Sequence, residues 1–94
     1  MEKTLTITNN KIEFLHFLKK MFPLFHLSNL FFRDVHYGII DFLEFKKIKT
    51  NYGEAEKIAI EVVKFYEKLN ILKKISNNTW VLNYSEFVQP KKAN

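Results

Sequence analysis

The longest regular pattern of hydrophobic and polar positions runs from residue 51 to residue 70 and predicts a helix. Apolar side chains recur there at the three- and four-residue steps of one helix face, at Ala55, Ile58, Ala59, Val62, Val63, Tyr66 and Leu69. Asn51 is expected to cap the start, with Thr50 as the alternative, and Glu54 to reach back to the cap as in a capping box. Asn70 then tolerates the left-handed conformation that is common just past a helix end.

The segment after this helix predicts a β-hairpin. Residues 71–76 and 79–84 are rich in apolar side chains and flank two Asn residues, which can adopt the positive φ values of a two-residue primed turn. Placing Ser76 opposite Thr79 gives one face that is almost wholly apolar, made of Ile71, Ile75, Trp80, Leu82 and Tyr84. An isolated hairpin is marginal in water, so we expect this face to pack on the helices.

Two further helices are predicted upstream. The first begins near Asn10 and ends before Pro23, because a proline disfavours helical geometry in the residue that precedes it. The second is capped by Ser28 and continues to about Phe45. Gly38, in the middle of that helix, costs about 1 kcal/mol relative to Ala, so we expect a packing reason such as a close helix crossing.

The two ends of the chain give shorter patterns. Residues 4–8 alternate polar and apolar side chains, which fits either a short strand beside the hairpin or a frayed terminus. Residues 85–88 are expected to form a final turn, followed by a mobile tail. The chain therefore divides into an N-terminal strand or flexible segment (1–9), one domain (10–84) and a basic C-terminal tail (85–94).

Together these elements predict a mainly α fold, with three helices followed by a two-stranded antiparallel hairpin and a possible third short strand from the N-terminus. Over roughly residues 10 to 84 this order resembles the winged-helix fold. The resemblance is carried by the junction Glu67–Lys74, which reads EKLNILKK, and by the strand that finishes in Trp80, Val81 and Leu82. The predicted second helix is long for its position, and the connector from Phe45 to Asn51 is longer than the turn of a helix-turn-helix.

Composition narrows the classes of function. The chain has 94 residues, enough for one domain, and no cysteine, which excludes disulfides and thiolate chemistry. It shows neither a secretory signal nor an apolar run long enough to span a bilayer, so we expect a cytoplasmic protein without a membrane partner. The formal net charge of +5 favours an anionic partner such as nucleic acid.

No pattern indicates catalysis or a cofactor. His16, His26 and His36 are ten residues apart, which is not the spacing of metal ligands on a helix or of a zinc signature. Asp34 and His36, two residues apart on a helix, point to different faces. No glycine-rich loop follows a strand. We expect no enzyme activity, metal, cofactor or small-molecule substrate.

The resemblance implies a function. In winged-helix proteins that bind DNA, the third helix enters the major groove and the hairpin touches the backbone or the minor groove. By position, the implied contacts are Asn51, Tyr52, Lys57 and Lys64 on the helix, Lys73 and Lys74 on the hairpin, and Lys46, Lys47 and Lys49 in the connector. Lysine interacts with phosphates mainly as a point charge. The bidentate hydrogen bonds that recognise guanine usually come from arginine, and the chain has only one, Arg33. The first hypothesis is a double-stranded-DNA-binding protein, a dimeric transcriptional regulator; solvated lysines without a partner are the alternative reading of this charge.

The aromatic residues support a second hypothesis. The chain has ten Phe, and Phe17, Phe31 and Phe65 lie off the predicted inward faces. Either those faces are simply wide, or these residues form a hydrophobic patch for a protein partner or a homodimer. The second hypothesis is therefore a winged-helix protein–protein interaction module within a larger assembly. The four Glu against three Lys of the third helix favour it, since phosphates repel carboxylates.

Overall fold

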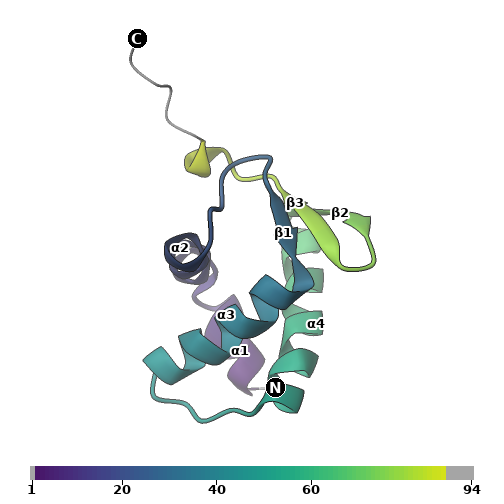
Figure 1. Ribbon diagram of the computed structural model, residues 1–94. Helices are drawn as coiled ribbons and strands as arrows, with labels where there is room; N and C mark the ends of the chain where they lie inside the picture. The colour runs from purple at the N-terminus through teal and green to yellow at the C-terminus, as the bar shows by residue number, and fades with distance from the viewer. Residues whose placement is uncertain (1, 89–94) are drawn as a thin grey trace.

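The computed structural model describes residues 2–88, which form four helices, a three-stranded antiparallel sheet and a short 3-10 turn (Figure 1). The elements are α1 (Glu2–Thr8), α2 (Lys11–Met21), β1 (Asn29–Phe31), α3 (Phe32–Phe45), α4 (Tyr52–Lys68), β2 (Leu72–Ser76), β3 (Thr79–Leu82) and the turn η1 (Ser85–Phe87). The mainly α fold with a small antiparallel sheet is confirmed, and the sheet has the strand order β1-β3-β2.

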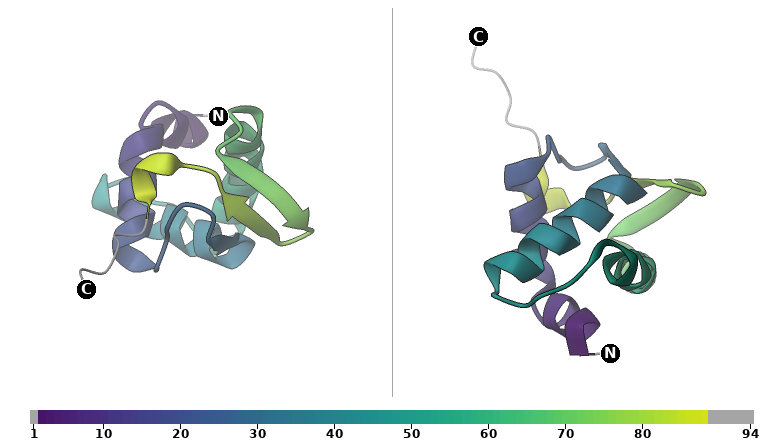
Figure 2. Two further views of the ribbon diagram at one scale, coloured as in Figure 1. Left: turned by 90° about the horizontal axis from the view of Figure 1, so that it is seen from above. Right: turned by 60° about the horizontal axis from the view of Figure 1, so that its bottom comes forward.

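Helices α3 and α4 form the centre of the molecule. They pack against each other, α2 packs against α3, and α1 packs against α4 (Figures 1 and 2). The sheet lies at the end where α3 begins and α4 finishes. Buried side chains from all these elements form one core, which includes Ile7, Phe14, Leu18, Leu30, Ile39, Phe42, Val62, Tyr66, Trp80 and Leu82.

Helix α4 begins and ends as the sequence predicts. The side-chain oxygen of Asn51 accepts a hydrogen bond from the backbone N–H of Glu54 at 2.8 Å, so Asn51 is the cap. The predicted apolar face is buried except for Leu69, which is exposed at the C-terminal end. Asn70 has a φ of 61°, in the left-handed region. The Glu54 side chain does not reach back to the cap and instead accepts hydrogen bonds from Lys3 and Thr50.

The hairpin turns at the predicted place, Asn77 and Asn78, but neither residue has the positive φ that was expected of a primed turn, and the predicted register is also wrong. Ser76 lies opposite Thr79, and beyond that pair the partners are Leu72 with Leu82, Lys73 with Val81, and Lys74 with Trp80. Ile75 is the extra residue of a β-bulge and its side chain is 58% exposed. A one-residue shift moves every later side chain to the other face of the strand, so Leu72 rather than Ile75 faces the core.

The third strand of the sheet comes from Asn29–Phe31, and the possible third strand from the N-terminus does not form. Leu30 is buried and lies opposite Trp80. The backbone carbonyl of Ser28 accepts a hydrogen bond from the N–H of Leu82 at 3.0 Å, which extends the pairing toward the start of β1. This segment therefore covers the free edge of β3.

The same strand shortens the second predicted helix. Ser28 was expected to cap it, but the Ser28 hydroxyl donates to the carbonyl oxygen of Phe25 at 2.7 Å and closes a turn before β1. Helix α3 begins only at Phe32 and ends at Phe45, the predicted end. Its length of 14 residues is therefore shorter than the sequence pattern predicted.

The segment 4–8, predicted as a strand or a frayed terminus, belongs to helix α1. A helix of seven residues has little stability alone, so packing against α4 must hold it. Ile7 is buried in the core, whereas Leu5 is exposed. The two apolar residues therefore mark one helix face and its edge rather than alternate faces of a strand.

The described range finishes with the expected final turn, Ser85–Phe87, in which Phe87 is buried. The mobile tail predicted for residues 89–94 lies outside the described residues. Among residues 2–88, no helix combines the length and the apolar character needed to cross a membrane.

Gly38 lies where α3 packs on α2, as its place in the sequence predicted. A Cβ atom at this position would overlap the Cδ2 atom of Leu18, whose side chain is buried in the core. Overpacking a well-packed core typically costs about 1–3 kcal/mol, so we expect Gly38→Val to lower the free energy of unfolding by that amount. Urea unfolding followed by circular dichroism measures the change.

Gly53 provides the matched control. It lies exposed in the first turn of α4, and a Cβ there meets only the Asn51 side-chain oxygen at 3.7 Å, an ordinary contact. Gly53→Ala should raise the free energy of unfolding by up to about 1 kcal/mol, because alanine favours the helix. A Gly38→Val variant as stable as the native chain would contradict the close crossing.

Candidate nucleic-acid interface

Three lysines lie in a row on the exposed face of α4. Lys57, Lys64 and Lys68 are separated by seven and four residues, so they share the helix face opposite the buried one. All three side chains are exposed. Lys57 and Lys64 were predicted contacts. Lys68 was not, although its four-residue step from Lys64 is the signal that would have identified it. We refer to these three residues as the lysine row.

One lysine of the hairpin joins the lysine row. Lys74 is on the sheet face of its partner Trp80, and together with Lys64 it lines a groove of about 150 Å³ between α4 and the hairpin. Lys73 pairs with Val81 and lies on the opposite face of the sheet. The two hairpin lysines were predicted to act together, but the structure brings only Lys74 to the α4 side.

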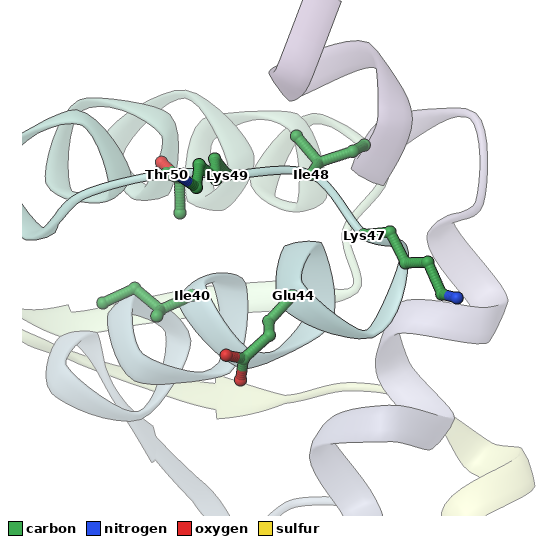
Figure 3. Close-up of a pocket in the computed structure, with 6 residues that line it drawn as sticks. All are labelled: Ile40, Glu44, Lys47, Ile48, Lys49 and Thr50. Carbon is green, nitrogen blue, oxygen red and sulfur yellow. The ribbon is translucent and has the colours of Figure 1, made fainter.

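The connector lysines lie elsewhere. Lys46 Nζ lies 3.0 Å from both carboxylate oxygens of Glu13 on α2. Helix α3 ends on the side of the molecule away from the hairpin (Figure 1), and Lys47 follows two residues after its last residue, Phe45. It borders a pocket of about 280 Å³ with Ile40, Glu44, Ile48, Lys49 and Thr50, and its side chain points away from that pocket (Figure 3). These lysines do not extend the lysine row.

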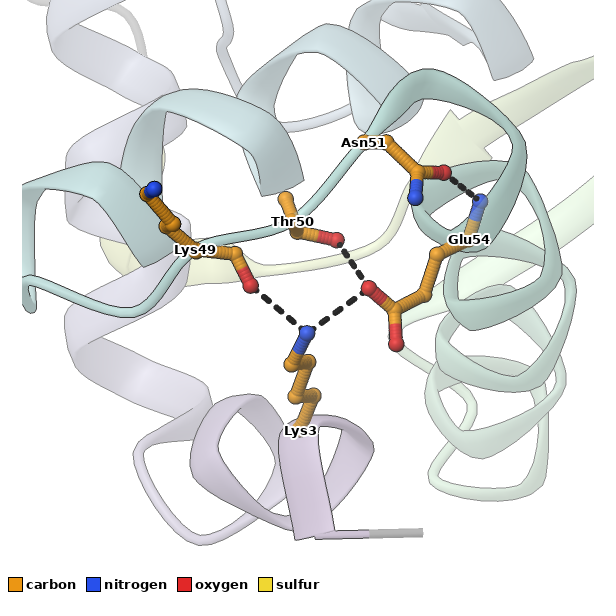
Figure 4. Close-up of polar contacts among 5 residues, drawn as sticks. All are labelled: Lys3, Lys49, Thr50, Asn51 and Glu54. Atoms are coloured by element: carbon orange, nitrogen blue, oxygen red, sulfur yellow. Dashed lines mark hydrogen bonds and ion pairs between the residues drawn. The ribbon is translucent and has the colours of Figure 1, made fainter.

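The N-terminus of α4 is held by a polar cluster that α1 completes (Figure 4). Lys3 Nζ donates to the carbonyl oxygen of Lys49 at 2.6 Å and to Glu54 Oε1 at 2.7 Å. The Thr50 hydroxyl donates to the same Glu54 oxygen at 2.9 Å. Because the Asn51 side-chain oxygen caps the helix, it is occupied and not free to accept from a base.

Three of the four glutamates of α4 are held beside the lysine row by neighbouring elements. Glu54 pairs with Lys3, and Glu61 accepts a hydrogen bond from the Thr4 hydroxyl at 2.6 Å. Glu67 accepts from the indole Nε1–H of Trp80 at 2.8 Å. The exposed face therefore presents the lysine row beside two exposed carboxylates, Glu56 and Glu61, of which Glu61 accepts the hydrogen bond from Thr4.

The ion pair at Glu54 predicts a pH dependence of stability. Hydrogen bonds from Lys3 and then from Thr50 hold the pKa of Glu54 below its ordinary 4.5. A lowered pKa in the folded chain means that the ionised carboxylate stabilises the fold at neutral pH, and this stabilisation is lost as the pH falls below 4.5 and through the lowered pKa. Glu54→Gln should therefore be less stable than the native chain at pH 7.

The two proteins should converge at low pH. Urea midpoints measured from pH 7 down to pH 2 should show the difference between Glu54→Gln and the native chain shrinking as Glu54 is protonated. A difference that stays constant with pH would mean that the charge of Glu54 contributes nothing through Lys3.

Tyr52, another predicted contact, lies at the edge of α4 next to α3. Its ring centroid is 4.2 Å from that of His36 and 6.1 Å from that of Tyr37. The neighbouring Tyr37 is the main cause that raises the pKa of Tyr52 above its ordinary value. His36 is buried and its Nε2–H donates to the Tyr52 carbonyl oxygen at 2.9 Å. The Tyr52 side chain is therefore 58% exposed, and its ring packs against those of His36 and Tyr37.

The other histidines serve separate local roles. Nδ1 of His26 accepts a hydrogen bond from the backbone N–H of Tyr84 at 3.0 Å. The His16 ring packs edge-on against Phe87 at 5.0 Å between centroids. Within residues 2–88, no three His, Cys, Asp or Glu side chains come together in a way that would hold a metal ion.

The three phenylalanines predicted to bind a partner differ in exposure. Phe17 packs on Phe42 and Phe45, with ring centroids 5.3 and 5.8 Å away, and is partly buried. Phe65 is also partly buried against the core. Phe31, at the start of α3, is 43% exposed. Phe17 and Phe65 therefore belong to wide apolar faces that pack on the core. Phe31 is the most exposed of the three and the best placed to contact a partner.

Known proteins add no family to this description. Comparison of the chain with protein-family models, curated proteins and solved structures finds no significant match. The lysine row, Lys74 and the groove between them are therefore the features from which a function can be inferred.

Proposed function

We propose that the protein binds double-stranded DNA, with the exposed face of α4 in the major groove and the hairpin against the adjoining backbone. The observation that carries this proposal is the convergence of the lysine row with Lys74 on one surface. None of these four ammonium groups has an acidic partner among the described residues. Unpaired lysines that converge from two elements fit a polyanion, because each phosphate contact releases bound counterions from the DNA.

The order of the elements supports a winged-helix arrangement for this surface. After the short N-terminal helix α1, the order is helix α2, strand β1, helices α3 and α4 and the hairpin, and β3 pairs with both β1 and β2. The resemblance to the winged-helix fold rests on three helices followed by a hairpin, and it implies that the last helix before the hairpin is the reading helix. The length of α3, 14 residues, also suits that position better than the longer helix predicted from sequence.

The glutamates of α4 are the main argument against phosphate binding, and their partners weaken it. The Glu54 carboxylate forms an ion pair with Lys3 at 2.7 Å. Glu61 and Glu67 are drawn toward α1 and the hairpin by their hydrogen bonds. The ion pair offsets the charge of Glu54, whereas Glu61 and Glu67 keep their charge in hydrogen bonds with neutral donors.

A salt titration tests the proposal. We expect a random 30-base-pair duplex to bind at low salt, and the logarithm of the affinity to fall with the logarithm of the salt concentration with a slope of about −3 to −4, for four lysine contacts. Fluorescence anisotropy of a labelled duplex gives both quantities. Absence of binding at 20 mM salt would refute the proposal, and a slope near zero would refute the phosphate contacts.

The regulatory role belongs to the same proposal. Domains of this size that read DNA through one helix commonly act as dimers on two half-sites, so the proposed regulator would place two copies on a palindromic site. Sedimentation velocity with a duplex that carries two half-sites should then show two copies per duplex. One copy on every duplex tested would contradict the dimer.

Protein docking is the second candidate function. The specific observation that favours it is the exposed aromatic pair Tyr37 and Tyr52, beside the partly buried Ile40. If this pair mediates self-association, Tyr37→Ser with Tyr52→Ser should shift the protein to monomer in sedimentation velocity. An unchanged sedimentation coefficient would argue against self-docking through this pair.

A further inference from the structure

Ile60 is an exposed isoleucine in the middle of the lysine row. It follows Lys57 by three residues and precedes Lys64 by four, so it lies on the same face between them. Its side chain is 44% exposed, and between residues 53 and 68 it is the one large apolar side chain in the exposed class. The proposed DNA-binding face therefore carries one exposed apolar side chain beside the lysine row, next to the exposed Glu61.

The surroundings of Ile60 restrict what can cover it. Ile60 lines the groove between α4 and the hairpin together with Phe32, Val63 and Trp80, which give it apolar walls. Lys64 and Lys74 line the same groove, and neither has an acidic partner among the described residues. The one carboxylate in the lining, Glu67, accepts a hydrogen bond from Trp80, so the groove has a net positive charge. A suitable occupant is therefore a small apolar group attached to a polyanion.

The other side chains of α4 leave few ways to read bases. The helix contains no arginine, and the side-chain oxygen of Asn51 caps its N-terminus. Lysine acts mainly as a point charge toward phosphates. Among base edges in the major groove, the group recognised by apolar contact is the 5-methyl group of thymine.

We propose that Ile60 contacts thymine 5-methyl groups in the major groove, and that the protein therefore prefers A·T-rich duplexes. This inference rests on the proposed function, because it requires the exposed face of α4 to enter the groove. Ile60, whose side chain has neither charge nor hydrogen-bonding groups, would then recognise a base through apolar contact alone. The lysine row then supplies affinity and Ile60 supplies the preference.

Replacing thymine by deoxyuridine tests this contact, because it removes only the methyl group. Anisotropy titrations would compare an alternating A·T duplex with the same duplex in which every thymine is deoxyuridine. We expect the native chain to bind the thymine duplex more tightly, by about fourfold for each methyl group in contact. Ile60→Ala should bind the two duplexes equally.

Ile12→Ala is the matched control. Ile12 is an isoleucine of similar exposure, 39%, on α2, outside the proposed interface. This variant should keep the thymine preference of the native chain. Circular dichroism melting of both variants verifies that they are folded, which their exposure leads us to expect.

Each outcome decides between the two proposals. If the native chain binds neither duplex at low salt, the proposed function fails and the Ile60 contact fails with it. If the native chain binds both duplexes equally, the DNA-binding function stands and the methyl contact is refuted. If Ile60→Ala keeps the full thymine preference, another residue reads the methyl group and Ile60 only covers the groove.

Discussion

Lys64→Glu combined with Lys74→Glu should lower the affinity for duplex DNA by at least about a hundredfold at 0.1 M salt. Each lysine–phosphate contact contributes about one factor of ten at this salt concentration through counterion release, and the new carboxylates add repulsion. The two residues come from α4 and from the hairpin and line one groove, so the variant affects both proposed contacts with DNA. Anisotropy titrations should also show the salt slope reduced by about two.

A second double variant separates this surface from the overall charge. Lys20→Glu with Lys47→Glu changes the net charge by the same amount, and both lysines are exposed, on α2 and after α3. We expect its affinity to fall much less, by the weak long-range effect of net charge alone. An equal loss in both variants would mean that charge anywhere on the protein governs binding. The lysine row would then have no special role.

Phe42→Ala should lower the free energy of unfolding by about 3–5 kcal/mol, the usual cost of truncating a buried phenylalanine. The Phe42 side chain is fully buried, and its ring packs edge-on against Phe14 and Phe17, with centroids 5.2 and 5.3 Å away. This cluster joins α2 to α3, so the cavity removes packing from both helices. Since small domains are stable by about 5–15 kcal/mol, the loss is a large share of the total. Urea unfolding measures it.

Phe45→Ala is the control in the same helix. Phe45 lies three residues after Phe42 and is 64% exposed, although Phe17 also touches its ring. Its replacement should cost less than about 1 kcal/mol, because little of the side chain leaves a packed environment. A cost for Phe45→Ala as large as that for Phe42→Ala would contradict the small contribution that its exposure predicts for Phe45.

The elements that the sequence predicted well are those with local signals. The cap at Asn51, the helical period of α4, the left-handed Asn70 and the position of the turn are each set by residues close in sequence, although Asn77 and Asn78 do not adopt the predicted positive φ. The hairpin register is different. Either Ile71 or Leu72 could start the inner face, and the bulge at Ile75 that decides between them depends on how the strand packs on the core.

Elements that depend on distant contacts could not be predicted from the pattern alone. Leu30 is a strand residue because it pairs with Trp80, far along the chain. Helix α1 is held by contacts with α4 such as Lys3 with Glu54, a separation of 51 residues. The same holds for the charge of α4. Its four glutamates outnumber its three lysines in the sequence, but in the fold three of the four carboxylates accept hydrogen bonds from α1 or the hairpin.

The candidate site divides in the same way. Helical spacing alone places Lys57 and Lys64 on one face of α4, and it would have added Lys68. The positions of the connector lysines depend on where the connector lies in three dimensions, and Lys46 is paired with Glu13 on α2. Charge near a predicted reading helix in the sequence is thus a weak guide to charge near it in space.

Chemical-shift mapping with a duplex tests the central claim most directly. In ¹⁵N-labelled protein at low salt, we expect the amide signals of Lys57, Ile60, Lys64, Lys68 and Lys74 to shift as duplex is added, while those of α2 and of residues 46–47 stay in place. Shifts confined to α2 or to the connector, or no shifts at all, would contradict DNA binding by the exposed face of α4.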